Sequence, residues 1–209
     1  MYSPNYNQIE NRTEILGFMR ANNFAVVITA NAEGGGLQPT ASHLPVLVEE
    51  RGAELVIVAH MAKNNPQWEQ FFDDEVLVVF HGPHAYVSPR WYLDRQRVPT
   101  WNYAAVHAYG KVRAFHEPEA KRFAVAKLVA HHDPQWQADF DKLAPTYMDG
   151  MLNSIVAFEI PVSRLETRWK LSQNRGRHEM ELIAGELDNS AHASERELAG
   201  LMRAHMVEK

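Results

Sequence analysis

Apolar residues occur over much of the chain in short runs rather than at helical spacing. Runs rich in β-branched and aromatic residues favour strands, because such side chains pack well on a pleated surface. They predict strands over residues 24–29, 44–48, 55–59, 76–80, 155–160 and 164–171. Residues 103–115 are long enough for one bent strand with Gly110 at the bend. Turns are expected at the glycine-rich segment 33–36 and at the polar segment 49–52.

Helical spacing appears in fewer places, and two of the expected helices begin with a clear cap. Asn11 precedes a short amphipathic segment, and Glu14 is placed to reach back to the cap. Asn65 and Pro66 fit the N-cap and the first position of a second, short helix. A third helix is expected to have Phe123 on its apolar side. The helices after residue 115 are predicted over 118–131, 136–143 and from 179 onward, with a break near 188–190.

Many short strands at hairpin spacing, followed by later helices, predict a mainly β fold with added helices, of the α+β class. We expect an antiparallel, Greek-key-like β-barrel decorated by helices. A doubly wound α/β sheet is disfavoured, because helices do not alternate with the first strands. Residues 1–175 are expected to form the barrel domain, with inserted helices at 118–143. Residues 176–209 are expected to be a helical extension of the same domain.

Composition narrows the chemistry more than the fold. None of the 209 residues is cysteine, which excludes disulfides and thiolate nucleophiles or metal ligands. The formal net charge of −5 gives no overall electrostatic reason to bind nucleic acid or an acidic membrane. No apolar run is long enough to cross a bilayer, and the first residues lack a secretory pattern, so we expect a cytoplasmic protein. Motifs of P-loop, Rossmann, zinc-protease and serine-hydrolase proteins are absent.

The segment Ala-His-Met-Ala-Lys-Asn-Asn-Pro at 59–66 is the most informative for binding. A strand is expected to end here, and a loop carrying His60 and Lys63 leads into the capped helix at Asn65. Free backbone N–H groups at a helix start attract phosphate, and Lys63 would neutralise it. The alternative interpretation is a surface loop with a solvated lysine.

Three other segments offer groups that suit a planar or charged ligand. Small and hydroxylated residues at 39–45 allow close approach to the backbone, although an edge strand containing proline explains them as well. Trp101 and Asn102 place an aromatic ring beside an amide directly before a strand, yet such rings more often fill a core. The basic stretch 164–177 suits a phosphate, an acidic partner or nucleic acid, or is a solvated strand face.

A histidine pair raises the question of a metal. His81 and His84 lie three residues apart with Gly82 and Pro83 between them, which we interpret as a turn. No carboxylate at ligand spacing accompanies the pair, so no metal site is expected.

Five segments taken together point to a known family. They are Ala-Ser-His-Leu-Pro at 41–45, His-Met-Ala-Lys-Asn-Asn-Pro-Gln-Trp at 60–68, Gly-Pro-His-Ala-Tyr-Val-Ser-Pro at 82–89, Val-Pro-Thr-Trp-Asn-Tyr at 98–103 and Lys-Leu-Ser-Gln-Asn-Arg at 170–175. In sequence and order they resemble the PaiB-like family, described as FMN-binding negative transcriptional regulators. The resemblance extends from residue 1 to about residue 175. One departure is Lys63, where arginine is expected: lysine keeps the charge but loses bidentate phosphate geometry.

The resemblance implies an FMN-binding split β-barrel, similar to pyridoxamine phosphate oxidases and small flavin reductases. Such barrels are homodimers with the flavin near the subunit interface. The phosphate would lie at the loop after a central strand, and the preceding strand would follow the isoalloxazine ring. The cofactor-binding residues implied in this chain are Ser42, His43, Leu44, His60, Met61, Ala62, Lys63, Asn64, Trp101, Asn102, Lys170, Gln173 and Arg175.

Three functions follow from this resemblance as alternatives. The first is a regulator in which FMN binding shifts a conformation that controls transcription, with DNA contact, if any, from residues 164–177 or the C-terminal helices. The second is a flavin-dependent oxidoreductase acting on a small molecule, for which His43, His84 and Tyr86 are candidate substrate contacts. The third is a haem-binding split barrel with a histidine as axial ligand. No catalytic residue is assigned.

Overall fold

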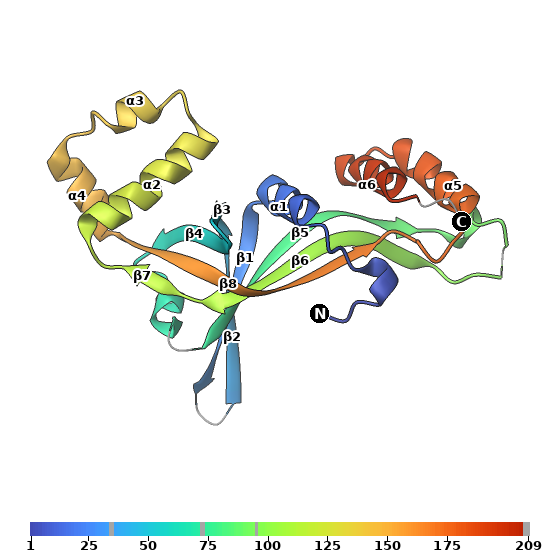
Figure 1. Cartoon of the computed structure of the whole chain (residues 1–209), viewed down its shortest axis with the longest axis horizontal. Helices are drawn as coiled ribbons and strands as arrows, with labels where there is room; N and C mark the ends of the chain where they lie inside the picture. Colours follow the sequence, from blue (N-terminus) through green and yellow to red (C-terminus); the bar gives the residue numbers. More distant parts are fainter. Residues whose placement is uncertain (34–35, 72–73, 95, 207–209) are drawn as a thin grey trace. The chain divides into compact units, whose positions relative to one another are not determined.

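The computed structural model describes residues 1–33, 36–71, 74–94 and 96–206, and it is dominated by antiparallel strands (Figure 1). The strands are β1 (Phe24–Glu33), β2 (Gly36–Pro45), β3 (Leu47–Arg51), β4 (Glu54–Ala62), β5 (Glu75–Val87), β6 (Thr100–Lys111), β7 (Arg113–Phe115) and β8 (Ile155–Lys170). They follow one another in the sheet as β2-β1-β5-β6-β8-β4-β3, and β7 pairs with β8. The described strand pairs are antiparallel, which confirms the predicted fold class.

Helices occupy both ends of the chain and one insertion. The α-helices are α1 (Arg12–Ala21), α2 (Pro118–His132), α3 (Gln137–Phe140), α4 (Pro145–Asn153), α5 (Arg177–Asp188) and α6 (Ala193–Ala204). The 3₁₀ helices are η1 (Asn5–Asn7), η2 (Pro66–Gln70) and η3 (Pro89–Trp91). At α1 the side chain of Asn11 accepts the backbone N–H of Glu14 at 3.1 Å, which confirms the predicted helix start, whereas the Glu14 carboxylate, expected to reach back to the cap, lies 2.6 Å from Nε2 of His205. The segment 136–143 contains only the four-residue α3, and α4 was not predicted.

The chain divides into two compact units. Unit 1 consists of Met1–Phe18, His81–Val106 and Glu166–Lys209, and unit 2 of Met19–Phe80 and His107–Leu165. Strands β5, β6 and β8 therefore contribute residues to both. None of the described helices is both long enough and apolar enough to span a bilayer.

The structure corrects several expected strand boundaries. The segment 44–48 is interrupted at Val46, which belongs to neither β2 nor β3 and whose N–H bonds to the Asn23 carbonyl at 2.8 Å. Residues 155–171, expected as two strands, form the single strand β8. Residues 103–115 divide at Val112 into β6 and β7. The expected glycine-rich turn is centred on residues 34–35, which lie outside the described residues.

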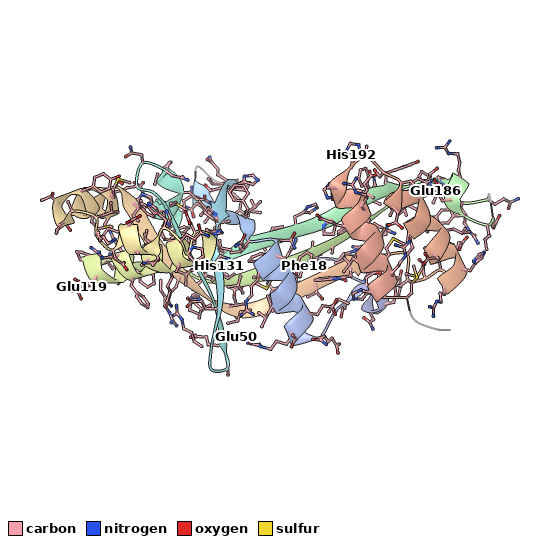
Figure 2. All side chains as sticks on the ribbon, turned by 90° about the horizontal axis from the view of Figure 1, so that it is seen from above. Phe18, Glu50, Glu119, His131, Glu186 and His192 are labelled. Carbon is pink, nitrogen blue, oxygen red and sulfur yellow. The ribbon has the colours of Figure 1, made fainter. Side chains whose placement is uncertain are left out.

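Gly82 and Pro83 do not form a turn, because both lie inside the thirteen-residue strand β5. Glycine is required at position 82 for packing. A Cβ there would lie 2.4 Å from Cε2 of Phe18, which projects from α1 (Figure 2). The same Phe18 ring lies 4.6 Å from the ring of the fully buried Trp169. Close approach to a packed aromatic ring therefore explains the glycine in unit 1.

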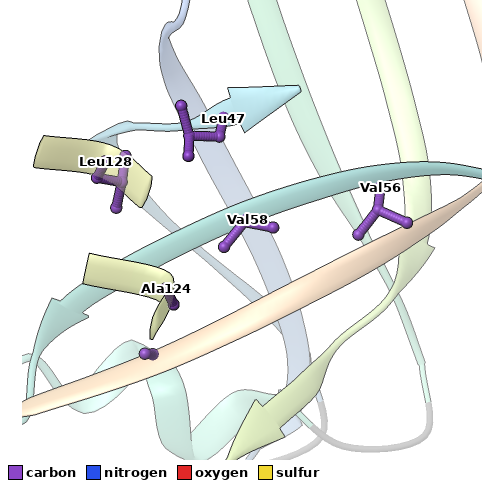
Figure 3. Packing of buried hydrophobic residues seen from close by; sticks show 6 residues of the cluster. Leu47, Val56, Val58, Ala124 and Leu128 are labelled. Atoms are coloured by element: carbon purple, nitrogen blue, oxygen red, sulfur yellow. The ribbon is translucent and has the colours of Figure 1, made fainter. Parts of the chain in front are cut away.

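In unit 2 the inserted helices pack on the sheet through α2. Ala124 and Leu128 on α2 meet Leu47, Val56 and Val58 of β3 and β4 in one buried cluster (Figure 3). Phe123 was expected on this side of the helix, but its side chain is 62% exposed. The smaller Ala124 takes the buried position, because it allows α2 to approach the strands closely.

Candidate functional site

The turn between β4 and η2 is held by its own hydrogen bonds. His60, Met61 and Ala62, expected in a loop, belong to β4, and only Lys63 and Asn64 form the turn. The N–H of Lys63 donates to the Ser154 carbonyl at 2.8 Å, and the Lys63 carbonyl accepts the indole N–H of Trp68 at 2.8 Å. The backbone N–H and the carbonyl of Lys63 therefore both have partners, and these two hydrogen bonds hold the turn in place.

The predicted cap of the following helix is confirmed, and two backbone N–H groups at the helix start are already bonded. Asn65 accepts the N–H of Gln67 at 3.0 Å, and Pro66 occupies the first helical position. The helix is a five-residue 3₁₀ segment, which carries little macrodipole. The N–H of Asn65 is also bonded, to the Ala62 carbonyl at 2.9 Å. The side chains of Lys63 and Asn64 are both exposed at this turn and are available to an anion.

Strand β2 is joined to this turn through a side-chain contact. Asn65 Nδ2 donates to Ser42 Oγ at 2.8 Å, so the amide that caps η2 also anchors β2. His43 is exposed and its ring lies 6.0 Å from that of Phe24, whereas Leu44 is buried. Ser42 therefore lies beside the Lys63 turn, while Leu44 belongs to the core.

Alternation along β4 separates the side chains of His60 and Met61. Met61 is buried, whereas His60 lines a cavity beneath α2, α3 and α4. Nδ1 of His60 is buried and has no hydrogen-bond partner among the described residues. Burial lowers the pKa of His60, so the ring is neutral at pH 7.

Stability is expected to fall below neutral pH because the pKa values of two histidines, His60 and His81, are lowered. Burial lowers the pKa of His60, and burial together with the charge of His84 lowers that of His81. Below pH 6.5 the unfolded chain binds protons at these two histidines, whereas the native chain binds fewer. The free energy of unfolding therefore decreases as pH falls. For His60 the slope is at most about 1.4 kcal/mol per pH unit. Urea unfolding between pH 7.5 and 5 measures the free energy of unfolding as a function of pH. Its slope against pH should be flatter for His60→Gln and unchanged for the exposed His178→Gln. Equal slopes in the two variants would contradict the assignment.

A cation-rich pocket of about 250 Å³ lies in unit 1. It is lined by residues of the N-terminal segment, of the loop before β6 and of the end of β8, including Tyr2, Tyr92, Thr100, Arg168, Lys170, Gln173 and Arg175. The guanidinium of Arg168 lies 5.4 Å from the Tyr2 ring centre, and that of Arg175 lies 5.0 Å from the Tyr92 ring centre. Positive charge and aromatic faces thus meet in one concave site.

The cations of this pocket are fixed by contacts within unit 1. Arg168 donates to the Tyr2 carbonyl, while Lys170 donates to Thr100 Oγ1 and, at 2.6 Å, to the Trp101 carbonyl. Burial lowers the pKa of Lys170, and the neighbouring Arg168 charge lowers it further. A bound anion would relieve this mutual repulsion.

The buried side chain of Asn102 makes a contact that the sequence did not predict. It is fully buried, and its amide exchanges two hydrogen bonds with the Ser172 hydroxyl, at 2.9 and 3.1 Å. Ser172 has a positive φ of 64° and starts the turn in which the Arg175 N–H bonds to the Ser172 carbonyl at 2.8 Å. Asn102 therefore orients the turn that carries Gln173 and Arg175. No local signal in the sequence links two residues seventy positions apart.

Exposed rings form a row on β5 and β6 of unit 1. The ring of Trp101, 54% exposed, lies 6.1 Å from Tyr86 and 6.3 Å from His84. His84 in turn lies 4.7 Å from His81. Among the described residues, no three histidine or acidic side chains gather in a group that could hold a metal ion. The row is instead an open aromatic surface on which a planar molecule could stack.

The structure thus brings the candidate residues together in two groups. Unit 2 holds Ser42 beside the Lys63–Asn64 turn, and it holds His43, Leu44, His60, Met61 and Ala62 in the adjoining strands. Unit 1 holds Trp101, Asn102, Lys170, Gln173 and Arg175 around or beside the cation-rich pocket. Tyr2, Tyr92 and Ser172 complete the second group.

Comparison with known proteins agrees with this architecture. The chain is 37% identical over 206 residues to the Bacillus subtilis "Protease synthase and sporulation protein PAI 2", covering 97% of this chain and 96% of the relative. Among solved structures, the FAD and haem binding protein of Mycobacterium smegmatis superposes with a TM-score of 0.59 at 14% identity, over 78% and 73% of the two chains. The flavocytochrome Anf3 of Azotobacter vinelandii gives 0.57 at 11% identity, over 78% and 69%.

The two structural likenesses support the split-barrel fold and nothing beyond it, given their low identity. The family is decided by sequence: residues 1–164 match the family described as "Putative FMN-binding domain". With a matched region that covers β1 to β7 and most of β8, this chain belongs to that FMN-binding domain family.

Proposed function

We propose that this chain binds FMN and is a regulatory protein whose conformation responds to the bound flavin. The observation that carries the proposal is the pocket of unit 1, where Arg168, Lys170 and Arg175 lie among aromatic rings. FMN combines a planar, electron-poor ring system with a dianionic phosphate, so it requires both kinds of contact. Family membership supports the same ligand.

We assign the phosphate to Lys63 and Asn64. Lys170 and Arg175 are already engaged by a hydroxyl, a carbonyl or an aromatic ring, and Arg168 donates to the Tyr2 carbonyl, although its buried Nε has no partner among the described residues. Within the described part of the chain, no hydrogen bond or ion pair occupies Nζ of Lys63. An exposed, unpaired ammonium beside the amide of Asn64 suits an oxygen-rich anion.

The cations of unit 1 then have a second role, toward the flavin ring. Positive side chains near the pyrimidine edge of a flavin stabilise its reduced, anionic form. The pocket holds about 250 Å³, which accommodates part of a flavin but not all of it. We therefore infer a homodimer in which both chains line each site. When bound, FMN would supply one-electron or hydride chemistry, and the protein would bind and orient it.

Regulation of transcription is the proposed biological role. It rests on the family resemblance and on the B. subtilis relative, whose name refers to protease synthase and sporulation. The formal net charge of −5 means that any DNA contact must come from a local basic surface. A salt-reversible shift of DNA by the FMN-loaded protein would support the role.

A second candidate is a flavin-dependent oxidoreductase, favoured by the exposed aromatic row. His84, Tyr86 and Trp101 offer exposed stacking faces and hydrogen-bonding groups on β5 and β6. A small planar substrate held there would lie against the same unit. Flavin-dependent oxidation of NADH or NADPH would favour this function over regulation alone.

The deciding experiment is the visible spectrum of the full-length protein after addition of FMN and desalting. A retained flavin spectrum, with one FMN per chain, supports the proposal. Haem added in the same way gives the comparison: a Soret band without flavin retention would assign the site to haem. Loss of both chromophores on desalting would contradict FMN as the resident ligand.

A further inference from the structure

The polar side chain of Gln67 is fully buried in unit 2. It belongs to η2, four residues after Lys63 in the chain. Its Nε2 donates to the Val27 carbonyl of β1 at 2.9 Å and to the Thr40 carbonyl of β2 at 3.1 Å. Two carbonyl acceptors require donor hydrogens, so the amide must place its NH₂ group toward them. One side chain therefore joins η2 to two neighbouring strands.

A second hydrogen-bond path starts from the same nitrogen. Nε2 of Gln67 lies 3.2 Å from Oγ1 of Thr29, and the Thr29 hydroxyl donates to Oε1 of Gln70 at 2.5 Å. Thr29 is buried, and Gln70 is the last residue of η2. Hydrogen bonds arranged in such a chain polarise one another where water is excluded. The 3₁₀ segment η2 is thus held to β1 at two of its residues.

These contacts determine where the turn of Lys63 and Asn64 lies. Within η2, the indole of Trp68 donates to the Lys63 carbonyl at 2.8 Å. At the start of η2, Nδ2 of Asn65 donates to Oγ of Ser42 in β2 at 2.8 Å. The turn leads directly into η2, so a shift of η2 against β1 and β2 moves the exposed Lys63 ammonium relative to β2.

The amide of Gln67 leaves one buried atom unpaired. Its Oε1 has no hydrogen-bond partner among the described residues. An unsatisfied buried oxygen destabilises a fold, and such departures from good packing chemistry concentrate at functional sites in native proteins. The oxygen contributes nothing that would explain a buried glutamine, so the position depends on the two donor hydrogens.

We propose that Gln67 is a positioning residue for the anion-binding turn: by tying η2 to β1 and β2, its amide holds Lys63 where the ammonium meets the FMN phosphate. The inference rests on the proposed function, in which Lys63 receives that phosphate. It adds that phosphate affinity depends on a fully buried side chain, which acts through Lys63 and does not itself touch the ligand.

The first test is Gln67→Met, which keeps the length of the side chain and removes both donor hydrogens. In the full-length protein, FMN affinity should fall about tenfold, while the affinity for riboflavin, which has no phosphate, stays unchanged. Gln135→Met, at an exposed position, should leave both affinities unchanged. A role confined to the fold would change both affinities equally or neither, and either result would overturn the proposal.

The double variant separates positioning from a direct effect on the ligand. In a Lys63→Ala background, adding Gln67→Met should change FMN affinity less than about twofold, because the group that Gln67 positions is absent. Additive losses would refute the proposal. If the native chain retains FMN but binds riboflavin as tightly, the phosphate lies elsewhere, which refutes this inference and leaves FMN as the ligand. If the native chain binds neither flavin, the proposed function fails as well.

A milder variant and a measurement without flavin cover the case in which Gln67→Met does not fold. Thr29→Val keeps the shape of the side chain and removes the hydroxyl beside Gln67. FMN affinity should then fall about threefold, with riboflavin affinity unchanged. The amide hydrogen of Lys63, bonded to the Ser154 carbonyl, should exchange about fivefold faster relative to that of Ile57 in β4. Unchanged relative exchange would show that this network does not hold the turn and would overturn the proposal.

Discussion

Replacing Gly110 by alanine is expected to lower the free energy of unfolding by about 3 kcal/mol. A Cβ at this position would lie 2.1 Å from the Pro161 carbonyl oxygen and 2.8 Å from Cγ2 of Ile160. The first contact is with the backbone of β8, so no rotation of a side chain relieves it. In a chain of this size the loss corresponds to a decrease of roughly 6–12 °C in Tm, measurable by calorimetry.

The matched control is another glycine of unit 2. Gly150 lies in α4, is exposed, and an added Cβ meets nothing within 4 Å. Gly150→Ala should raise the free energy of unfolding by about 0.5–1 kcal/mol, because alanine favours a helix. If Gly110→Ala were as stable as the native chain, β6 and β8 would not approach each other as closely as described.

Replacing Lys63 by alanine is expected to weaken FMN binding by about 1–3 kcal/mol, or roughly 5- to 150-fold. The ammonium of Lys63 is the side chain that we assign to the phosphate. A fully solvated ion pair contributes less than about 1 kcal/mol, so the upper part of this range requires that bound flavin and the partner chain shield the pair from water. Titration of protein fluorescence or flavin fluorescence measures the affinity.

Riboflavin, which lacks the phosphate, separates this role from a general effect on the fold. Lys63→Ala should leave riboflavin affinity unchanged. Lys111→Ala, at an exposed lysine at the end of β6, should leave the affinities for both flavins unchanged. An equal loss of FMN and riboflavin affinity in Lys63→Ala would show that Lys63 does not contact the phosphate.

The sequence correctly predicted the elements that are determined by residues close together in the chain. The Asn11 cap, the Asn65–Pro66 helix start and the break between α5 and α6 each depend on residues a few positions apart, and all three are present. The alternation of small apolar runs with polar turns likewise predicted the antiparallel fold. Such features need no knowledge of the rest of the chain.

Boundaries set by distant neighbours were not predicted. The sequence predicted that one strand ends at residue 160 and another begins at 164, but β8 continues through Pro161, with Val56 of β4 opposite. The expected helix start at Asn65 is present, yet the N–H groups of Asn65 and Gln67 already have partners within the turn. Both outcomes depend on which backbone groups find partners far along the chain.

The sequence predicted which residues belong to the candidate site, but it did not predict which of them lie in contact. The family blocks identified Lys63, Lys170 and Arg175, whereas the partners that hold them are distant. Tyr2 under Arg168 and Ser172 against Asn102 could not be found from spacing, because they come from the N-terminal segment and from a turn with positive φ. Family resemblance supplies a set of residues, and tertiary structure decides what each can contact.

The insertion between β7 and β8 has a consequence for how this fold can vary. β7 and β8 pair directly, with Phe115 opposite Ala157, so residues 116–156 are in effect the loop of a β-hairpin. Closing a loop of about forty residues instead of four costs only about 2 kcal/mol of chain entropy. The packing of α2 against β3 and β4 readily offsets that cost. This segment can therefore change in length and sequence among descendants of one sheet while the strands of the barrel stay the same.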